Sequence, residues 1–222
     1  MAGVFIVLEG IDGCGKTSAL FKIAEKIANQ SKKYDHILIK RYDHILVTRE
    51  PTYSNDAGRK ARELLKKDSD PKKNAEECLR LYVEDRKEHL KKDIIPALEK
   101  NYVVLCDRFK YSTMAFQKEQ GIPIQKIISL HEGMPSPDLT LILDLPAEVA
   151  FDRTNKRTEE VKEKKFEHLD FMKKLRNNYL EIPKLLQDEK IEIIKADQDR
   201  EKVADDIFKK IIDLKILEKL EK

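Results

Sequence analysis

The chain has 222 residues, which is long enough for one sizeable hydrophobic core. Its 44 basic and 41 acidic residues leave a net charge of +3, so the charge favours neither nucleic acid nor a membrane surface as a partner. Three cysteines form neither a metal-binding spacing nor a disulfide framework, and no apolar run or basic leader indicates membrane insertion or export. We therefore expect a cytoplasmic protein with a single domain over residues 1–222.

The first element predicted is a short apolar strand, "VFIVLE" at 4–9, followed by a glycine-rich loop and a helix that opens on Lys16. Gly10, Gly15, Lys16 and Thr17 fit the pattern G-x-x-x-x-G-K-[ST]. In such a loop the backbone N–H groups and the helix N-terminus face an anion. The lysine reaches the β and γ phosphates, and the hydroxyl binds Mg²⁺.

This loop predicts a site for the phosphates of ATP or GTP, because the strand before it and the helix after it are the context that the motif requires. By itself the loop leaves motor proteins, GTPases, kinases and transporters open. The residues predicted to hold the nucleotide are Gly10, Asp12, Gly13, Cys14, Gly15, Lys16, Thr17 and Ser18.

Four more short apolar runs follow, separated by segments with helical patterns, at 44–50, 102–109, 139–145 and 191–196. Strands that alternate with helices predict an α/β fold with a parallel sheet, and runs without polar alternation predict strands buried on both faces. The charged stretch 154–190 is helical in pattern, and the tail from 199 to 222 is predicted to form one amphipathic helix.

Charged residues follow the second and third predicted strands, where ligands of parallel sheets collect. Arg49, Arg62 and Arg108 are candidate clamps on a second phosphorylated molecule, since a guanidinium grips phosphate with two parallel hydrogen bonds. Asp107 is placed to order Mg²⁺ or its waters. Any single one of these arginines could instead form a surface ion pair of little consequence.

Five blocks in order, "EGIDGCGKT", "TREP", "LYVEDRKEHL", "DRFKYSTMAFQ" and "GMPSPDLTLILDL", resemble thymidylate kinase. The resemblance runs from about residue 3 to the last helix. It implies a P-loop fold with a five-stranded parallel sheet flanked by helices, and a helical lid. It also implies a homodimer that uses ATP and Mg²⁺ to convert dTMP to dTDP.

The resemblance assigns roles residue by residue. Asp12 matches the aspartate that hydrogen-bonds the 3′-hydroxyl of dTMP, and Arg108 matches the arginine that holds its phosphate, with Asp107 near the metal. Arg86 matches the arginine that reads the base, and Tyr82, one helical turn earlier, matches the aromatic residue that stacks on thymine.

Three residues of the fourth block complete the predicted acceptor site. Thr113 and Gln117 match positions near the thymine edge, and Phe116 matches the aromatic residue under the sugar that would crowd a ribose 2′-hydroxyl. Without the resemblance, ordinary core packing would be the better interpretation of Tyr82 and Phe116.

The lid departs from many relatives. Some members of the family carry an arginine in the phosphate loop, where this chain has Gly13, so the resemblance places the lid arginines at Arg153 and Arg157, within a lid at about 153–167. Lys165 stands where many relatives have an arginine. The "TREPTY" block also differs, because Thr52 and Tyr53 replace two glycines.

Two other interpretations stay open at this point. One is a related kinase whose acceptor is dUMP, dCMP or a free deoxynucleoside. The other is an ATP-binding homologue that regulates a partner. The predicted arginine clamps favour a monophosphate over a nucleoside acceptor, and the intact loop argues against a degenerate homologue.

Overall fold

The structure is a computed structural model that describes residues 3–31, 44–52, 54–67, 74–155 and 164–221. The elements in chain order are β1 (Val4–Glu9), α1 (Lys16–Ser31), β2 (Ile45–Arg49), α3 (Asp56–Lys67), α4 (Ala75–His89), the π-helix η1 (Leu90–Ile94), α5 (Ile95–Glu99), β3 (Val103–Asp107), α6 (Lys110–Glu119), α7 (Ile124–Ser129), β4 (Leu139–Asp144), α8 (Ala147–Asn155), α9 (Lys164–Leu185), β5 (Ile191–Lys195), α10 (Arg200–Asp213) and the 3₁₀-helix η2 (Ile216–Glu221).

The five strands form one parallel sheet in the order β2-β3-β1-β4-β5. Each strand lies within a run predicted from the sequence, so the predicted α/β fold with a five-stranded parallel sheet is confirmed. The register pairs Asp107 with Leu8 on one side and with Arg49 on the other. The carboxyl ends of β1, β2 and β3 therefore meet at one edge of the sheet, where a ligand site is expected.

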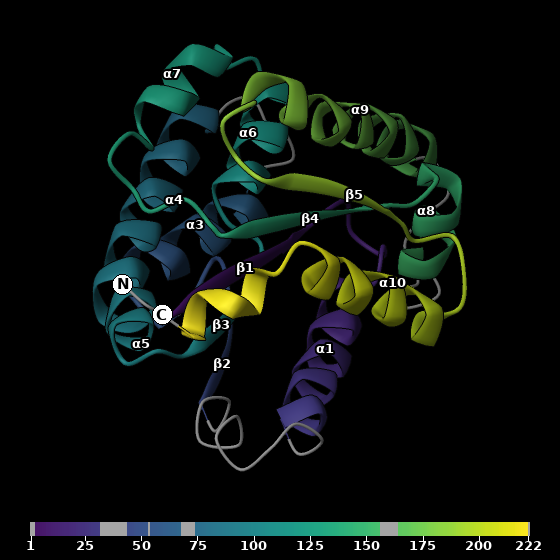
Figure 1. The fold of residues 1–222 in the computed structure, drawn as a ribbon. Coiled ribbons are helices and arrows are strands. Elements are labelled where there is room, and N and C mark those ends of the chain that lie inside the picture. The colour runs from purple at the N-terminus through teal and green to yellow at the C-terminus, as the bar shows by residue number, and fades with distance from the viewer. Residues whose placement is uncertain (1–2, 32–43, 53, 68–73, 156–163, 222) are drawn as a thin grey trace.

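Helices cover both faces of the sheet (Figure 1). Helices α1 and α10 lie side by side on one face, and α4, α6 and α9 cover the other. Because the central strands are buried on both faces, their residues need not alternate between polar and apolar. This explains the continuous apolar runs of the sequence.

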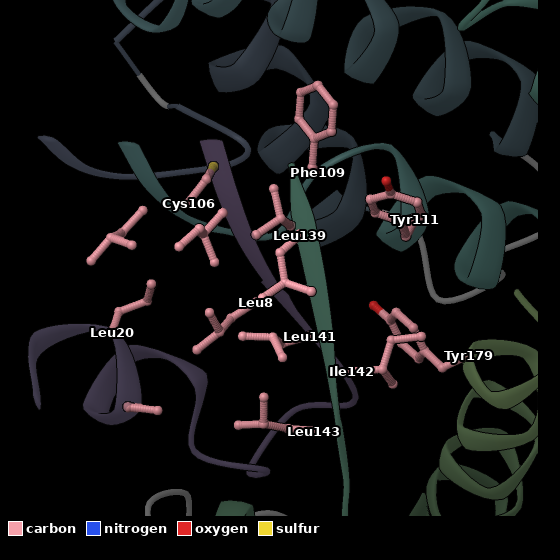
Figure 2. Packing of buried hydrophobic residues seen from close by; sticks show 14 of the residues in the cluster. Leu8, Leu20, Cys106, Phe109, Tyr111, Leu139, Leu141, Ile142, Leu143 and Tyr179 are labelled. Carbon is pink, nitrogen blue, oxygen red and sulfur yellow. The ribbon is translucent and has the colours of Figure 1, made fainter. Parts of the chain in front are cut away.

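The core is built around the central strands, and Figure 2 shows its packing. The residues from Val4 to Leu8 are at most 1% exposed. Phe109, Tyr111 and Tyr179 join them as fully buried aromatic side chains. Burying one such side chain contributes about 1.5–3 kcal/mol relative to leaving it in water, so these residues hold the functional edge of β1 and β3 rigidly.

The tail corrects one prediction. Instead of one helix to the end of the chain, α10 stops at Asp213, Lys215 adopts a left-handed φ of 54°, and η2 follows. The start is as expected from its sequence, because Asp199 caps α10 by accepting a hydrogen bond from the Glu201 N–H at 2.8 Å. None of the described helices combines the length and apolarity needed to cross a membrane.

Candidate active site

The phosphate loop leaves β1 at Gly10, and its backbone shape depends on glycine. Gly10 has φ +132° and Gly13 has φ +82°, in the region that L side chains rarely adopt. A Cβ on Gly13 would lie 2.6 Å from the carbonyl oxygen of Ala150 in α8. A loop arginine at this position would therefore strain the backbone and collide with α8.

Lys16 and Thr17 begin α1 at the end of this loop. The Lys16 ammonium is buried and donates to the carbonyl oxygens of Gly10 and Ile11 at 3.0 Å each, with a longer contact of 3.6 Å to the Cys14 sulfur. Its charge is thus held within the loop by the peptide backbone.

The Thr17 hydroxyl connects the loop to the neighbouring strand. It donates to the Asp107 carboxylate at 2.6 Å, across 90 residues of sequence. A hydroxyl and a carboxylate in contact offer the hard oxygen ligands that Mg²⁺ prefers. The two residues predicted to bind metal therefore lie together.

A cavity of about 280 Å³ lies beside the loop, at the carboxyl edge of the sheet. All of the predicted substrate-binding residues line this cavity, although they come from five separate segments of the chain. They are Asp12, Arg49, Arg62, Tyr82, Arg86, Arg108, Thr113, Phe116 and Gln117.

Arg108 lies at the end of the cavity nearest the loop, in a left-handed backbone conformation with φ 74°. Such a conformation costs on the order of 1–2 kcal/mol for a residue with a side chain, so its surroundings must hold it in place. Its Nη1 donates to Ser112 Oγ at 2.9 Å and to the Tyr179 hydroxyl at 2.8 Å, and its Nη2 donates to Asp12 at 2.6 Å. The guanidinium also lies 5.5 Å from the centre of the Phe116 ring.

Glu9, the last residue of β1, anchors this arrangement from within the core. Its fully buried carboxylate accepts hydrogen bonds from the Phe109 N–H, the Ser112 N–H and the Ser112 hydroxyl. Because that hydroxyl proton points at Glu9, the Tyr179 hydroxyl must donate to Ser112. Burial raises the pKa of the Glu9 carboxyl, while the positive charge of Arg108 acts to lower it.

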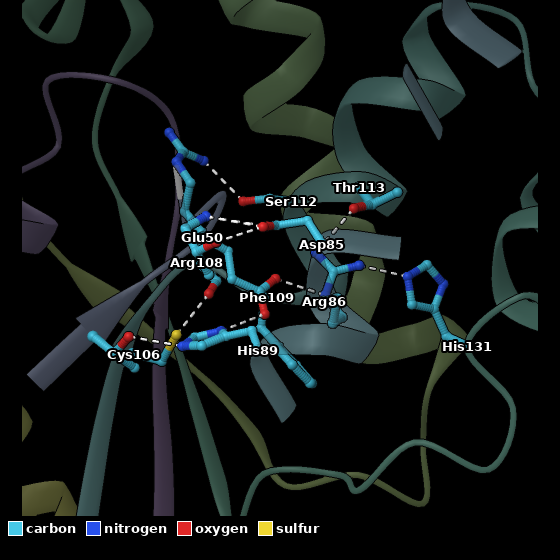
Figure 3. A network of polar contacts seen from close by, with 12 residues as sticks. Glu50, Asp85, Arg86, His89, Cys106, Arg108, Phe109, Ser112, Thr113 and His131 are labelled. Carbon is cyan, nitrogen blue, oxygen red and sulfur yellow. Dashed lines mark hydrogen bonds and ion pairs between the residues drawn. The ribbon is translucent and has the colours of Figure 1, made fainter. Parts of the chain in front are cut away.

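Arg86, the residue predicted to read the base, lies buried within a network of polar contacts (Figure 3). Its Nε donates to Glu50 at 2.7 Å, its Nη1 to His131 at 2.6 Å and its Nη2 to Thr113 at 3.2 Å. The guanidinium carbon is 5.1 Å from the centre of the Phe109 ring. Arg86 and Glu50 are 3% and 4% exposed, so removing one partner of this pair would leave a buried charge unpaired.

The loop after β2 is held by the residue that precedes Arg86. The carboxylate of Asp85 accepts hydrogen bonds from the Thr52 N–H and hydroxyl and from the Asn55 amide. Thr52, which replaces a glycine of many relatives, thus contributes a hydroxyl contact of 2.6 Å. Tyr53 lies outside the described residues.

The lid is only partly described. Arg153 is half-buried on α8, next to Thr154, whose Cγ2 would lie 3.2 Å from a Cβ on Gly13. Helix α8 therefore abuts the phosphate loop. Arg157 lies outside the described residues, and the structure does not describe the side chain of Lys165.

Comparison with known proteins identifies the family. The model of the thymidylate kinase family matches residues 8–207. The chain belongs to the thymidylate kinase family. The predicted resemblance and the predicted enzyme class, a phosphotransferase, are thereby confirmed.

Similarity to individual thymidylate kinases extends along most of the chain. It is 39% identical over 185 residues to a probable thymidylate kinase of Pyrococcus abyssi, covering 82% of this chain and 83% of that protein. It is 35% identical over 187 residues to the thymidylate kinase of Enterococcus faecalis, with coverage of 82% and 83%. It is 33% identical over 218 residues to that of Brachyspira hyodysenteriae, with coverage of 98% and 97%.

The sequence motifs did not predict several residues that line or support the cavity of this thymidylate kinase family member. Glu50 and Asp85 stand next to Arg49 and Arg86 in these motifs, and this adjacency was the signal that could have identified them. Phe109, Ser112 and Gln120 also lie within four residues of Arg108 or Gln117, so the same signal was present for them. Glu9, His131 and Tyr179 carry no such signal, because they contact the site residues across long sequence separations.

Proposed function

We propose that the chain transfers the γ-phosphoryl group of ATP to the phosphate of dTMP, giving dTDP and ADP. The observation that carries this proposal is the single cavity of about 280 Å³ that all nine predicted acceptor residues line beside the phosphate loop. The cavity has arginines near the loop that suit a phosphate, and polar side chains at its other end that suit a base.

At the nucleotide side, the amides of the loop and the Lys16 ammonium would bind the phosphates of ATP. Of the contacts that Lys16 makes, the one to the Cys14 sulfur is the longest, and a phosphate oxygen could replace it at the least cost. Thr17 and Asp107 would hold Mg²⁺, since their oxygens lie together and Mg²⁺ binds through few protein oxygens plus phosphates and water. When bound, the ion supplies positive charge to the phosphate oxygens.

At the acceptor side, Arg108 would bind the dTMP phosphate, with Arg49 and Arg62, which also line the cavity, as further phosphate contacts. Asp12 would accept a hydrogen bond from the 3′-hydroxyl, and Phe116 would lie under the sugar. The acceptor oxygen is already an anion, so no general base is required. The protein's contribution is to position two phosphates and to stabilise the charge that moves between them.

The base end of the cavity offers groups that fit thymine. Arg86 supplies N–H donors for a carbonyl oxygen, and Tyr82 lies one helical turn earlier on α4 for stacking. Gln117 lines the cavity and carries a buried carbonyl oxygen, Oε1, without a hydrogen-bond partner among the described residues. A buried acceptor without a partner is costly, and an N–H of the base would satisfy it.

The remaining proposals rest on the family assignment. We propose a single P-loop kinase domain over residues 1–222, with a lid at about 153–167 whose arginines, Arg153 and Arg157, stabilise the moving charge. The loop geometry at Gly13 supports placing these arginines in the lid, because it disfavours an arginine within the loop itself. We propose that the enzyme acts as a cytoplasmic homodimer.

The test is ADP release with Mg²⁺ and ATP in separate reactions containing dTMP, dUMP, dCMP, the ribose form of TMP or thymidine. We expect a strong preference for dTMP, with the ribose form and thymidine the poorest acceptors. Failure of every acceptor while ATP still binds would refute the proposal and favour an ATP-binding regulatory role.

A further inference from the structure

His131 contacts Arg86 from outside the cavity wall. It follows α7, 45 residues from Arg86 in the chain, and its side chain is buried. Its Nε2 lies 2.6 Å from Arg86 Nη1 (Figure 3), and its Nδ1 lies 2.7 Å from the carbonyl oxygen of Ile127 in the second half of α7. The ring therefore bridges the end of one helix and the guanidinium of another.

These partners determine the state of the ring. A carbonyl oxygen can only accept, so Nδ1 carries the proton, and a guanidinium can only donate, so Nε2 presents its lone pair. Burial, assisted by the charge of Arg86, lowers the pKa of His131 to about 3. The ring is thus a neutral acceptor for Arg86 at physiological pH.

The contact with His131 completes the support of Arg86. Of the five N–H groups of a guanidinium, one goes to Glu50, one to His131 and one to Thr113. Two N–H groups then remain without a partner among the described residues, on a side chain that lines the cavity. With the three fixed partners the guanidinium plane has little freedom to turn.

We propose that His131 is a positioning residue that holds the guanidinium of Arg86 toward the cavity and so selects 4-oxo over 4-amino pyrimidine monophosphates. This rests on the proposed function, in which Arg86 reads the base. A 4-oxo group can accept hydrogen bonds from the two remaining N–H groups of Arg86. A 4-amino group is itself a donor there, so the N–H groups of both Arg86 and the base would stay unpaired. Buried donors without partners give strong discrimination between ligands.

The test uses the full-length chain and measures the dissociation constants of dTMP, dUMP and dCMP by titration calorimetry. The variants are His131→Ala, His131→Leu, which keeps apolar volume, and His131→Gln, whose amide oxygen can take the place of the Nε2 acceptor. Ile207→Ala, in the buried face of α10 away from the cavity, serves as a control for lost stability alone. Cooperative thermal unfolding establishes that each variant is folded. If only one of His131→Ala and His131→Leu folds, that variant alone is enough for the test.

We expect His131→Ala and His131→Leu to weaken dTMP and dUMP about tenfold, while dCMP changes less than about twofold, because only a 4-oxo group uses the oriented donors. His131→Gln should stay within about threefold of the unaltered protein for all three ligands. The control should leave all three dissociation constants unchanged.

Equal weakening of the three ligands in His131→Ala or His131→Leu would overturn the inference, since it would indicate a structural role only. So would unchanged binding, or a loss in His131→Gln as large as in His131→Ala. These outcomes are separate from failure of the proposed function, which the turnover of dTMP by the unaltered enzyme tests.

Discussion

Arg108 Nη2 donates to Asp12 Oδ1 at 2.6 Å, and this contact joins the cavity to the phosphate loop. Asp12 belongs to the loop and Arg108 follows β3, 96 residues later. The same arginine is held from behind by Ser112 and Tyr179. Its position is therefore determined jointly by the phosphate loop and by α9, the helix that begins at Lys164 within the predicted lid.

Replacing Asp12 by alanine should impair acceptor binding more than folding. The side chain is 68% exposed, so we expect the unfolding free energy to change by less than about 1 kcal/mol, while the KM for dTMP rises about tenfold. Steady-state kinetics and urea unfolding measure the two effects. Asp56→Ala, which removes another exposed aspartate paired with an arginine, is the control and should leave KM unchanged. A normal KM in Asp12→Ala would contradict the assigned contact with dTMP.

Tyr179→Phe removes one hydroxyl that orients Arg108. We expect the KM for dTMP to rise severalfold and the unfolding free energy to fall by about 1–2 kcal/mol, because a buried hydrogen-bond partner is lost. Tyr111→Phe is a matched control, since its equally buried hydroxyl donates to Glu189 at 2.5 Å and lies outside the cavity lining. The positioning role fails if both variants lose stability to the same extent and neither changes KM.

Lys16→Ala should abolish turnover with the fold intact. In the proposed function the ammonium that the loop holds binds the β and γ phosphates, so its loss should lower kcat by at least about 10³-fold. Turnover of dTMP at saturating ATP measures the loss, and circular dichroism checks the fold. Lys22→Ala removes a lysine of the same helix that pairs with Glu201 on the surface, and it should be nearly silent. Turnover near normal in Lys16→Ala would exclude the phosphate-loop assignment.

The neutral state of His131 should make the free energy of unfolding depend on pH. Its folded pKa of about 3 lies below the ordinary value of 6.5, so below pH 6.5 the unfolded chain binds a proton that the folded chain excludes. Folding stability is then lost as the pH falls toward 3, by up to about 1.4 kcal/mol per pH unit for this group.

Urea unfolding of the unaltered chain and of His131→Gln, from about pH 7 to about pH 5, isolates this contribution, because glutamine does not titrate. The unaltered chain should lose its stability relative to the variant as the pH falls. Parallel stability curves for the unaltered chain and His131→Gln would show that the ring is not held neutral.

Local sequence determined the five strands and the phosphate loop of this protein. The apolar runs predict the strands, because buried parallel strands need no alternation of polar and apolar residues. The phosphate loop is predicted from a motif confined to residues 10–17. The resemblance extended this to the acceptor residues, which the structure then brings to one cavity. Their individual roles in binding stay predictions.

Tertiary structure alone decided how the site residues are held. Arg86 contacts Glu50 and His131 at sequence separations of 36 and 45 residues, and Arg108 contacts Tyr179 at 71. No pattern in a single chain marks such pairs, because they arise from which helices and strands pack together rather than from local backbone preference. The sequence by itself therefore determined which groups are available. The tertiary packing of α4, α7 and α9 decided which of them orient the two arginines, since hydrogen bonds require contact in space.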